Sequence, residues 1–202
     1  LVARAAKDNG AERVVLVEPD LFYSAQDRGP RRDQGQVDFE RTGRDFKKFD
    51  GQPFSARFYA EMLRTSGVDE VVTVHNHSLS VRRLFSEVFD GGFFNLSPAE
   101  LYANYLLTDD VDGVLGKTPG IVLCAPDGGA RGFVQDVYDA LSAATADMLL
   151  SPSVGRLFMR KDRRGERRVE IQPADDSPLG LGDLRGRDVI VFDDMVRTGY
   201  TI

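Results

Sequence analysis

The fold is decided by the stretch Val-Ile-Val-Phe-Asp-Asp-Met-Val-Arg-Thr-Gly-Tyr-Thr-Ile, which occupies residues 189–202. Its first four residues are apolar, a run too short to span a membrane and typical of a strand buried on both faces of a parallel sheet. Two adjacent carboxylates follow where this strand should end, and then comes a short loop, 197–201, with one glycine and two threonines. Ligands of open α/β sheets bind beyond the carboxyl ends of strands, so the sequence predicts a binding site here.

The chemistry of this loop suits a phosphate monoester carried on a sugar. Backbone N–H groups, the hydroxyls of Thr198 and Thr201 and the freedom of Gly199 are all suited to a phosphate group. The ionised side chains of Asp193 and Asp194 only accept hydrogen bonds, which suits the hydroxyl groups of the sugar. The alternative interpretation is a buried strand followed by an ordinary acidic turn.

Outward from this stretch, the chain alternates strand-like and helical segments. Apolar runs predict strands at 14–17, 70–74, 93–96 and 121–125, and two further strands, 156–160 and 167–171, flank a basic turn. The pattern predicts an α/β fold of two domains, 1–97 and 98–202, each with a mainly parallel sheet. Residues 29–52 are polar, rich in glycine and weakly periodic, and we expect a flap there. The chain starts within a helical pattern and stops after the loop, so we expect domains truncated at both ends.

Composition narrows the classes of protein that fit. A hydrophobic fraction of 42% with 29% charged residues is ordinary for a globular protein, and a net charge of −6 argues against a nucleic-acid binder. No apolar run reaches the roughly 20 residues of a membrane-spanning helix, and no signal peptide opens the chain. The single cysteine, Cys124, forms no internal disulfide and is predicted to be a buried thiol. These features predict a cytoplasmic protein without a membrane partner.

Residues 189–202 resemble the phosphoribosyl-binding motif of the type I phosphoribosyltransferase fold, in detail that of the ribose-phosphate diphosphokinases (PRPP synthetases). The family pattern is an apolar strand, Asp-Asp-Met, two variable residues and then Thr-Gly-Gly-Thr or Thr-Ala-Gly-Thr. Here Arg197 stands where an acid is usual, and Tyr200 stands where a glycine is usual. The resemblance implies two type I phosphoribosyltransferase-like domains with the site between them. It also implies that ribose 5-phosphate is bound by Asp193, Asp194, Arg197, Thr198, Gly199, Tyr200 and Thr201.

Two stretches of the first half match the same family. Residues 23–28, Tyr-Ser-Ala-Gln-Asp-Arg, are similar to Tyr-Ala-Arg-Gln-Asp-Arg, which implies that Gln26 and Asp27 bind ATP; Ala25 replaces an arginine of the family. Residues 72–77, Val-Thr-Val-His-Asn-His, resemble Leu-Thr-Val-Asp-Leu-His, which implies that His77 contacts ATP and its Mg²⁺ ion. His75 replaces a carboxylate there. The His-x-His spacing also suits a transition metal, because alternate strand residues share a face.

Two stretches of the second half complete the resemblance. Residues 124–129, Cys-Ala-Pro-Asp-Gly-Gly, are similar to Ser-Pro-Asp followed by a glycine pair, which implies that Asp127 is a second contact of the magnesium ion. Asp127 could instead cap the helix that follows. Residues 160–164, Arg-Lys-Asp-Arg-Arg, resemble Asp-Lys-Arg-Arg of the catalytic loop. The resemblance implies that Lys161 and Arg163 stabilise the transferring group; the alternative is a solvated basic hairpin.

Together with residues 189–202, these four stretches imply a transferase that moves the diphosphoryl group of Mg-ATP to ribose 5-phosphate, giving PRPP and AMP. In that family a neighbouring subunit completes the nucleotide site, which implies a homo-oligomer. Departures at Ala25, His75, Arg197 and Tyr200 support an alternative, a non-catalytic homologue that regulates or scaffolds the enzyme. A phosphoribosyltransferase acting on a base is a third reading, and the matches around Gln26 argue against it.

Overall fold

The computed structural model describes residues 1–35, 37, 40–76, 78–108, 120–146, 153–163 and 169–193, without the side chains of 161–163, 169 and 170. The chain divides into two compact units, Leu1–Ser97 and Pro98–Ile202. This division falls at the boundary placed from the sequence. Across the described ranges, none of the helices combines the length and the apolar character needed to cross a membrane.

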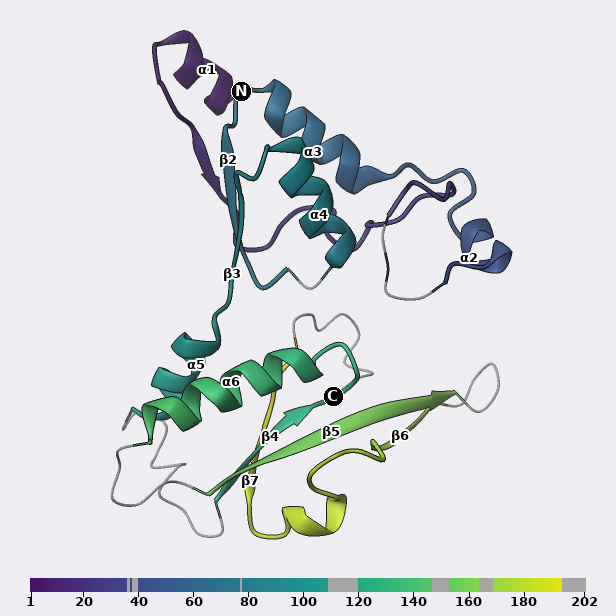
Figure 1. Cartoon of the computed structure of the whole chain (residues 1–202), viewed down its shortest axis with the longest axis vertical. Helices are drawn as coiled ribbons and strands as arrows, with labels where there is room; N and C mark the ends of the chain where they lie inside the picture. Colours follow the sequence, from purple (N-terminus) through teal and green to yellow (C-terminus); the bar gives the residue numbers. More distant parts are fainter. Residues whose placement is uncertain are drawn as a thin grey trace. The chain divides into compact units, whose positions relative to one another are not determined.

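The first unit is built on a parallel sheet in the order β1-β2-β3 (Figure 1). Its strands are β1 (Val15–Val17), β2 (Glu70–Val74) and β3 (Phe93–Leu96), and its helices are α1 (Val2–Asp8), α2 (Gly43–Lys47), α3 (Ser55–Thr65) and α4 (Leu79–Val88). Both α3 and α4 are amphipathic and bury one apolar stripe each in the same core. Val71 and Phe85 are fully buried in that core, so the two helices form one layer that packs against the sheet.

The second unit contains a four-stranded sheet in the order β6-β5-β4-β7. Its elements are α5 (Ala99–Leu106), β4 (Ile121–Ala125), α6 (Arg131–Ala144), β5 (Val154–Arg163), β6 (Val169–Pro173), η3 (Leu181–Leu184) and β7 (Asp188–Val191). Strand β4 runs parallel to β5 and β7, whereas β5 and β6 form an antiparallel hairpin. Helices α5 and α6 pack on one face of the sheet, and Leu179 and Leu184 pack on the other. The predicted α/β class with mainly parallel sheets is therefore confirmed.

The burial of the central strand and of the last strand differs. Every residue of β4 is buried, as expected of a strand covered on both faces. The prediction that the last strand is buried on both faces is wrong, because Val189 and Val191 of β7 are 40% and 41% exposed. The strand lies at the edge of the described sheet, where only one neighbour, β4, pairs with it.

Residues 29–52, expected to form a flap, are organised around the guanidinium group of Arg41, whose side chain is only 7% exposed. This group pairs with Asp45 at 2.7 Å, and the rings of Phe46 and Phe49 lie 4.3 and 5.5 Å from its central carbon. It also donates hydrogen bonds to the backbone carbonyl groups of Gly29, Arg31 and Gln34. The described part of the segment is thus folded, and it contains helix α2, which weak periodicity did not predict.

Acidification should loosen this segment. The hydrogen bond from Arg41 holds the pKa of the Asp45 carboxyl group below its ordinary value of 3.8. A depressed carboxyl pKa stabilises the fold above the pKa of the unfolded chain, and the stabilisation is lost as pH falls through the folded value. We expect amide hydrogen exchange in residues 40–49 to keep its protection, after correction for intrinsic rates, down to about pH 5 and to lose it below about pH 4. The Asp45→Asn variant should lack this pH dependence. An unchanged pH dependence in this variant would show that another titratable group causes the loss of protection.

Candidate functional site

Two of the predicted site residues follow neighbouring strands of the second sheet. Asp127 comes two residues after β4 ends, and Asp193 comes two residues after β7 ends. The strands are parallel, with Cys124 opposite Val191, and the Phe192 N–H donates to the Cys124 carbonyl at 3.0 Å. Both carboxylates therefore leave the sheet at the same carboxyl edge, where ligands of such sheets bind.

The third segment at this edge is the end of β5. Ala125, the last residue of β4, pairs with Phe158, and β5 continues beyond it for five residues to Arg163 (Figure 1). Lys161 and Arg163 lie in this extension, where their backbones pair with Ile171 and Val169 of β6. The hairpin thus carries both predicted catalytic residues past the edge at which Asp127 and Asp193 lie.

Asp127 also has a local structural role. Its Oδ1 atom accepts a hydrogen bond from the Gly129 N–H at 2.9 Å, in the turn that leads into α6. This contact resembles the capping alternative that the sequence left open, although α6 itself begins at Arg131 with Ala130 at its N-cap. A carboxylate has several acceptor sites, so accepting this bond and contacting a cation are not mutually exclusive.

The remaining predicted residues of the ribose phosphate loop lie outside the described residues: Asp194, Arg197, Thr198, Gly199, Tyr200 and Thr201. The same holds for His77 and for the side chains of Lys161 and Arg163. Their assigned roles stay predictions.

In the first unit, Asp27 of the 23–28 stretch contacts two serines that follow the 72–77 stretch. The Ser78 hydroxyl donates to the Asp27 carboxylate at 2.7 Å, and the Ser80 hydroxyl donates to the Asp27 carbonyl at 2.6 Å. Asp27 therefore fixes the start of α4, directly after the position of His77. Gln26 is exposed, and its carbonyl accepts from the Ala56 N–H at 3.4 Å, which leaves its side chain accessible to a ligand.

The loop after β2 is held by a pair of asparagines that the sequence analysis missed. The Asn76 N–H donates to Asn95 Oδ1 at 2.7 Å, and Asn95 Nδ2 donates back to the Asn76 carbonyl at 3.1 Å. Asn76 is buried, and its own side chain accepts from the Ser78 N–H. His75 has a φ of +49°, a conformation uncommon for residues other than glycine. The asparagine pair thus stabilises a tight turn immediately before His77.

Replacing Asn95 by alanine should loosen this turn. The buried N–H and carbonyl groups of Asn76 would lose their partners, which costs about 1–3 kcal/mol for an unsatisfied buried group. Urea denaturation followed by circular dichroism should show this loss, and Asn95→Asp, which keeps the acceptor, should lose less. Asn104→Ala, at an exposed position of α5, is the matched control. Equal stability of the Asn95→Ala and Asn104→Ala variants would show that the hydrogen bonds between Asn76 and Asn95 do not stabilise the turn.

A second missed residue, Glu18, positions the 23–28 stretch. Its carboxylate accepts from the Tyr59 hydroxyl at 2.8 Å and from the Phe22 N–H at 3.0 Å. Burial, followed by this hydrogen bond, raises the pKa of Tyr59, so the phenol stays protonated and remains a donor. Because Glu18 follows β1 directly, it fixes the path of the chain towards Gln26.

The described carboxylates suit a magnesium ion by their chemistry. Magnesium prefers oxygen ligands and is commonly held by one or two carboxylates together with substrate phosphates and water. Of the described residues, Asp127 supplies such a carboxylate at the carboxyl edge of the second sheet, whereas Asp193 at the same edge is assigned to the ribose hydroxyl groups. Cys124 supplies no ligand, because it is buried within β4 and burial raises the pKa of its thiol. The predicted buried thiol is confirmed.

The chain is similar to known proteins over nearly its whole length, although no family model matches it. It is 24% identical over 197 residues to the ribose-phosphate pyrophosphokinase of Methanobrevibacter smithii, covering 97% of this chain and 54% of that protein. It is 30% identical over 196 residues to the ribose-phosphate pyrophosphokinase of Methanothermobacter thermautotrophicus, covering 97% and 52% respectively. The chain spans about half the length of these curated relatives.

A solved structure supports the same relationship at the level of fold. The crystal structure of phosphoribosylpyrophosphate synthetase from Mycobacterium smegmatis matches with a TM-score of 0.63 and 23% identity, covering 99% of this chain and 50% of that chain. Pyrophosphokinase and diphosphokinase are two names for the same family. The predicted resemblance to this family is therefore confirmed: the chain is similar to ribose-phosphate pyrophosphokinases in sequence and to a phosphoribosylpyrophosphate synthetase in fold.

Proposed function

We propose that the protein is a ribose-phosphate diphosphokinase that converts Mg-ATP and ribose 5-phosphate into AMP and PRPP. The observation that carries this proposal is the convergence of three motif segments on the carboxyl edge of the second sheet. Asp127 after β4, Asp193 after β7 and the extension of β5 all leave the sheet there. The names of the relatives support the same activity.

In the proposed reaction the anomeric hydroxyl oxygen of ribose 5-phosphate attacks the β-phosphorus of ATP. A new bond forms between these two atoms, and the bond from the β-phosphorus to the oxygen it shares with the α-phosphorus breaks. AMP leaves with that oxygen, and the hydroxyl proton passes to solvent. Such transfers depend mainly on positioning and on cations near the developing charge, which is the role assigned to Lys161 and Arg163.

Ribose 5-phosphate would be held by the stretch after β7. Asp193 and Asp194 would accept hydrogen bonds from the ribose hydroxyl groups. The phosphate would lie in the loop formed by Arg197, Thr198, Gly199, Tyr200 and Thr201. Arg197 places a cation in this loop, which favours a dianionic phosphate, while Tyr200 narrows the backbone freedom that glycine gives in the family.

The nucleotide would be held through the first unit. Gln26, Asp27 and His77 are assigned to ATP, and the described contacts support a rigid frame for them, since Asp27 and Ser78 are joined directly. His77 and Asp127 are assigned to Mg²⁺, which when bound would neutralise charge on the polyphosphate. We also propose a homo-oligomer, because the family completes its nucleotide site with a second subunit. The composition of the sequence supports a cytoplasmic location.

Formation of AMP from ATP and ribose 5-phosphate by the intact protein, with and without Mg²⁺, tests this proposal. AMP formed only when all three are present is the expected result. Binding of ribose 5-phosphate and ATP without turnover would contradict catalysis and favour the non-catalytic homologue. That alternative rests on the departures at Ala25, His75, Arg197 and Tyr200.

A further inference from the structure

Phe192, the residue that links β7 to Asp193, is anchored twice. Its backbone N–H donates to the Cys124 carbonyl at 3.0 Å, which continues the pairing of β7 with β4 one residue beyond Val191. Its side chain is only 7% exposed and belongs to the core that α5 and α6 form with the second sheet. The backbone and the ring of Phe192 are therefore both fixed directly before the first carboxylate of the stretch assigned to ribose 5-phosphate.

The ring of Phe192 is part of a cluster of three aromatic rings from three different elements. It contacts Tyr102 on α5 and Phe133 on α6, with ring centroids 5.5 and 5.7 Å away. Tyr102 and Phe133 also contact each other, at 5.8 Å, and all three pairs are edge to face, with interplanar angles of 75°, 84° and 89°. In this geometry the positive edge of one ring meets the negative face of the next. Each ring of the cluster thus restricts the orientation of the other two.

Tyr102 completes the cluster from its outer side. Its side chain is 42% exposed, whereas Phe133 and Phe192 are 6% and 7% exposed. A smaller apolar residue in place of Tyr102 would therefore remove two ring contacts without opening a cavity in the centre of the core. This position allows the ring cluster to be perturbed while the unit stays folded.

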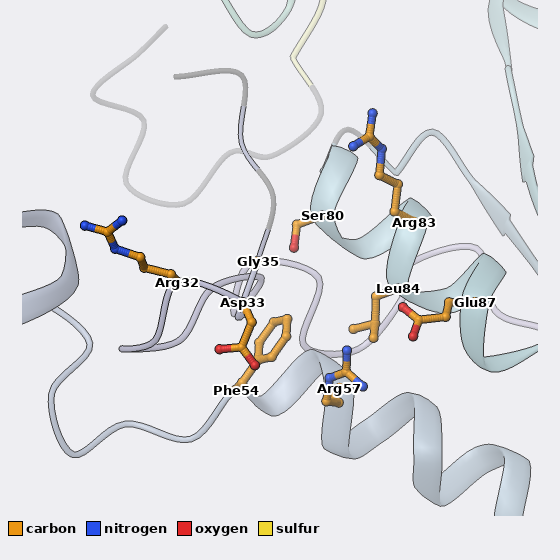
Figure 2. Close-up of a pocket in the computed structure, with 9 residues that line it drawn as sticks. All are labelled: Arg32, Asp33, Gly35, Phe54, Arg57, Ser80, Arg83, Leu84 and Glu87. Carbon is orange, nitrogen blue, oxygen red and sulfur yellow. The ribbon is translucent and has the colours of Figure 1, made fainter. Parts of the chain in front are cut away.

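The groups assigned to the nucleotide and its metal ion have anchors of their own. Asp127 accepts a hydrogen bond from the Gly129 N–H at 2.9 Å, within its own turn. Gln26 and Asp27 belong to the first unit, as does the cavity of about 320 Å³ between the 29–52 segment and helices α3 and α4, shown in Figure 2. None of these residues belongs to the ring cluster, so a change in the cluster should act on Asp193 first.

We propose that Tyr102, Phe133 and Phe192 are positioning residues for Asp193 and thereby set the affinity for the ribose ring of ribose 5-phosphate. This role rests on the proposed function, in which the Asp193 carboxylate accepts hydrogen bonds from the ribose hydroxyl groups. Such bonds weaken steeply when the distance or the angle between donor and acceptor is wrong. Because Phe192 directly precedes Asp193, freedom of its ring becomes freedom of the carboxylate.

Calorimetric titration of ribose 5-phosphate into the intact Tyr102→Leu variant tests this role. Leucine stays apolar but removes the edge-to-face contacts with Phe133 and Phe192, so the dissociation constant should rise about fivefold to tenfold. Tyr102→Phe keeps the ring and should keep the affinity of the unmodified protein. Phe192→Leu should weaken binding at least as much as Tyr102→Leu. The dissociation constant of Mg-ATP should stay unchanged in all three variants.

Tyr105→Leu is the matched control, because it removes a 56% exposed tyrosine of the same helix, α5, that lies outside the ring cluster. It should leave the affinity for ribose 5-phosphate unchanged. Equal affinities in the Tyr102→Leu and Tyr105→Leu variants would overturn the positioning role. Equal losses of affinity for ribose 5-phosphate and Mg-ATP in the Tyr102→Leu variant would also overturn it, because they would show a general loss of structure.

Amide hydrogen exchange tests the same role without a ligand. The Phe192 N–H, which is bonded to the Cys124 carbonyl, should exchange about tenfold faster in the Tyr102→Leu variant than in the Tyr102→Phe variant. Equal exchange rates would overturn the role. Ribose 5-phosphate binding that depends on the ring of Tyr102 without formation of AMP would support the role and contradict the proposed function. Formation of AMP with affinities that do not depend on this ring would do the reverse.

Discussion

Replacing Lys161 by alanine is expected to reduce turnover by about 10²–10³-fold with little change in the affinity for ribose 5-phosphate. Lys161 lies in the part of β5 that extends past the carboxyl edge of the second sheet, and it is assigned to the charge that develops on the transferring group. Removing a cation that acts mainly in the transition state lowers kcat and leaves substrate binding largely intact.

Steady-state measurement of AMP formation at varied ribose 5-phosphate checks this result. Lys161→Arg keeps the charge and should restore part of the activity, whereas Lys47→Ala, at an exposed position of α2, should have no effect. Unchanged turnover in the Lys161→Ala variant would remove this residue from the mechanism. Equal turnover in the Lys161→Ala and Lys47→Ala variants would lead to the same conclusion.

Replacing Arg41 by methionine is expected to unfold the 29–52 segment locally. The variant keeps much of the side-chain volume, but it leaves Asp45 and three backbone carbonyl groups without their shared donor. Breaking one partner of a buried, hydrogen-bonded pair is strongly destabilising. We expect amide hydrogen exchange in residues 40–49 to become roughly a hundredfold faster, while exchange in β4 stays unchanged.

Arg44→Met is the matched control for this prediction. Arg44 lies on the same helix, α2, and is exposed, so its loss should leave exchange in the segment nearly unchanged. Equal exchange rates in the Arg41→Met variant and the unmodified protein would show that the segment is held by other contacts.

The sequence predicts the elements whose signal is local. The strand predicted at 70–74 coincides with β2, and the apolar run at 121–125 coincides with β4, because each is a short segment rich in valine or other apolar residues and bounded by polar or turn residues. The basic turn between two strand-like segments likewise predicts the hairpin of β5 and β6. The carboxyl edge shared by Asp127 and Asp193 follows from parallel pairing alone, which alternating strands and helices predict.

Features that depend on long-range contacts cannot be predicted from local sequence patterns. The exposure of Val189 and Val191 depends on the position of β7 at the edge of the described sheet, which its apolar composition does not reveal. The fold of residues 29–52 depends on one arginine that reaches several backbone carbonyl groups, so no periodic pattern marks it. The pairing of Asn76 with Asn95 joins residues 19 positions apart and gives no motif.

The most direct test of the account is ³¹P NMR of the intact protein with Mg-ATP and ribose 5-phosphate. If the protein transfers the diphosphoryl group, the β- and γ-phosphorus signals of ATP are replaced by the two diphosphate signals of PRPP, while the α-phosphorus appears as AMP in equal amount. Release of inorganic phosphate with ADP, or an unchanged ATP spectrum while both substrates are bound, would contradict diphosphoryl transfer at the edge formed by β4, β5 and β7.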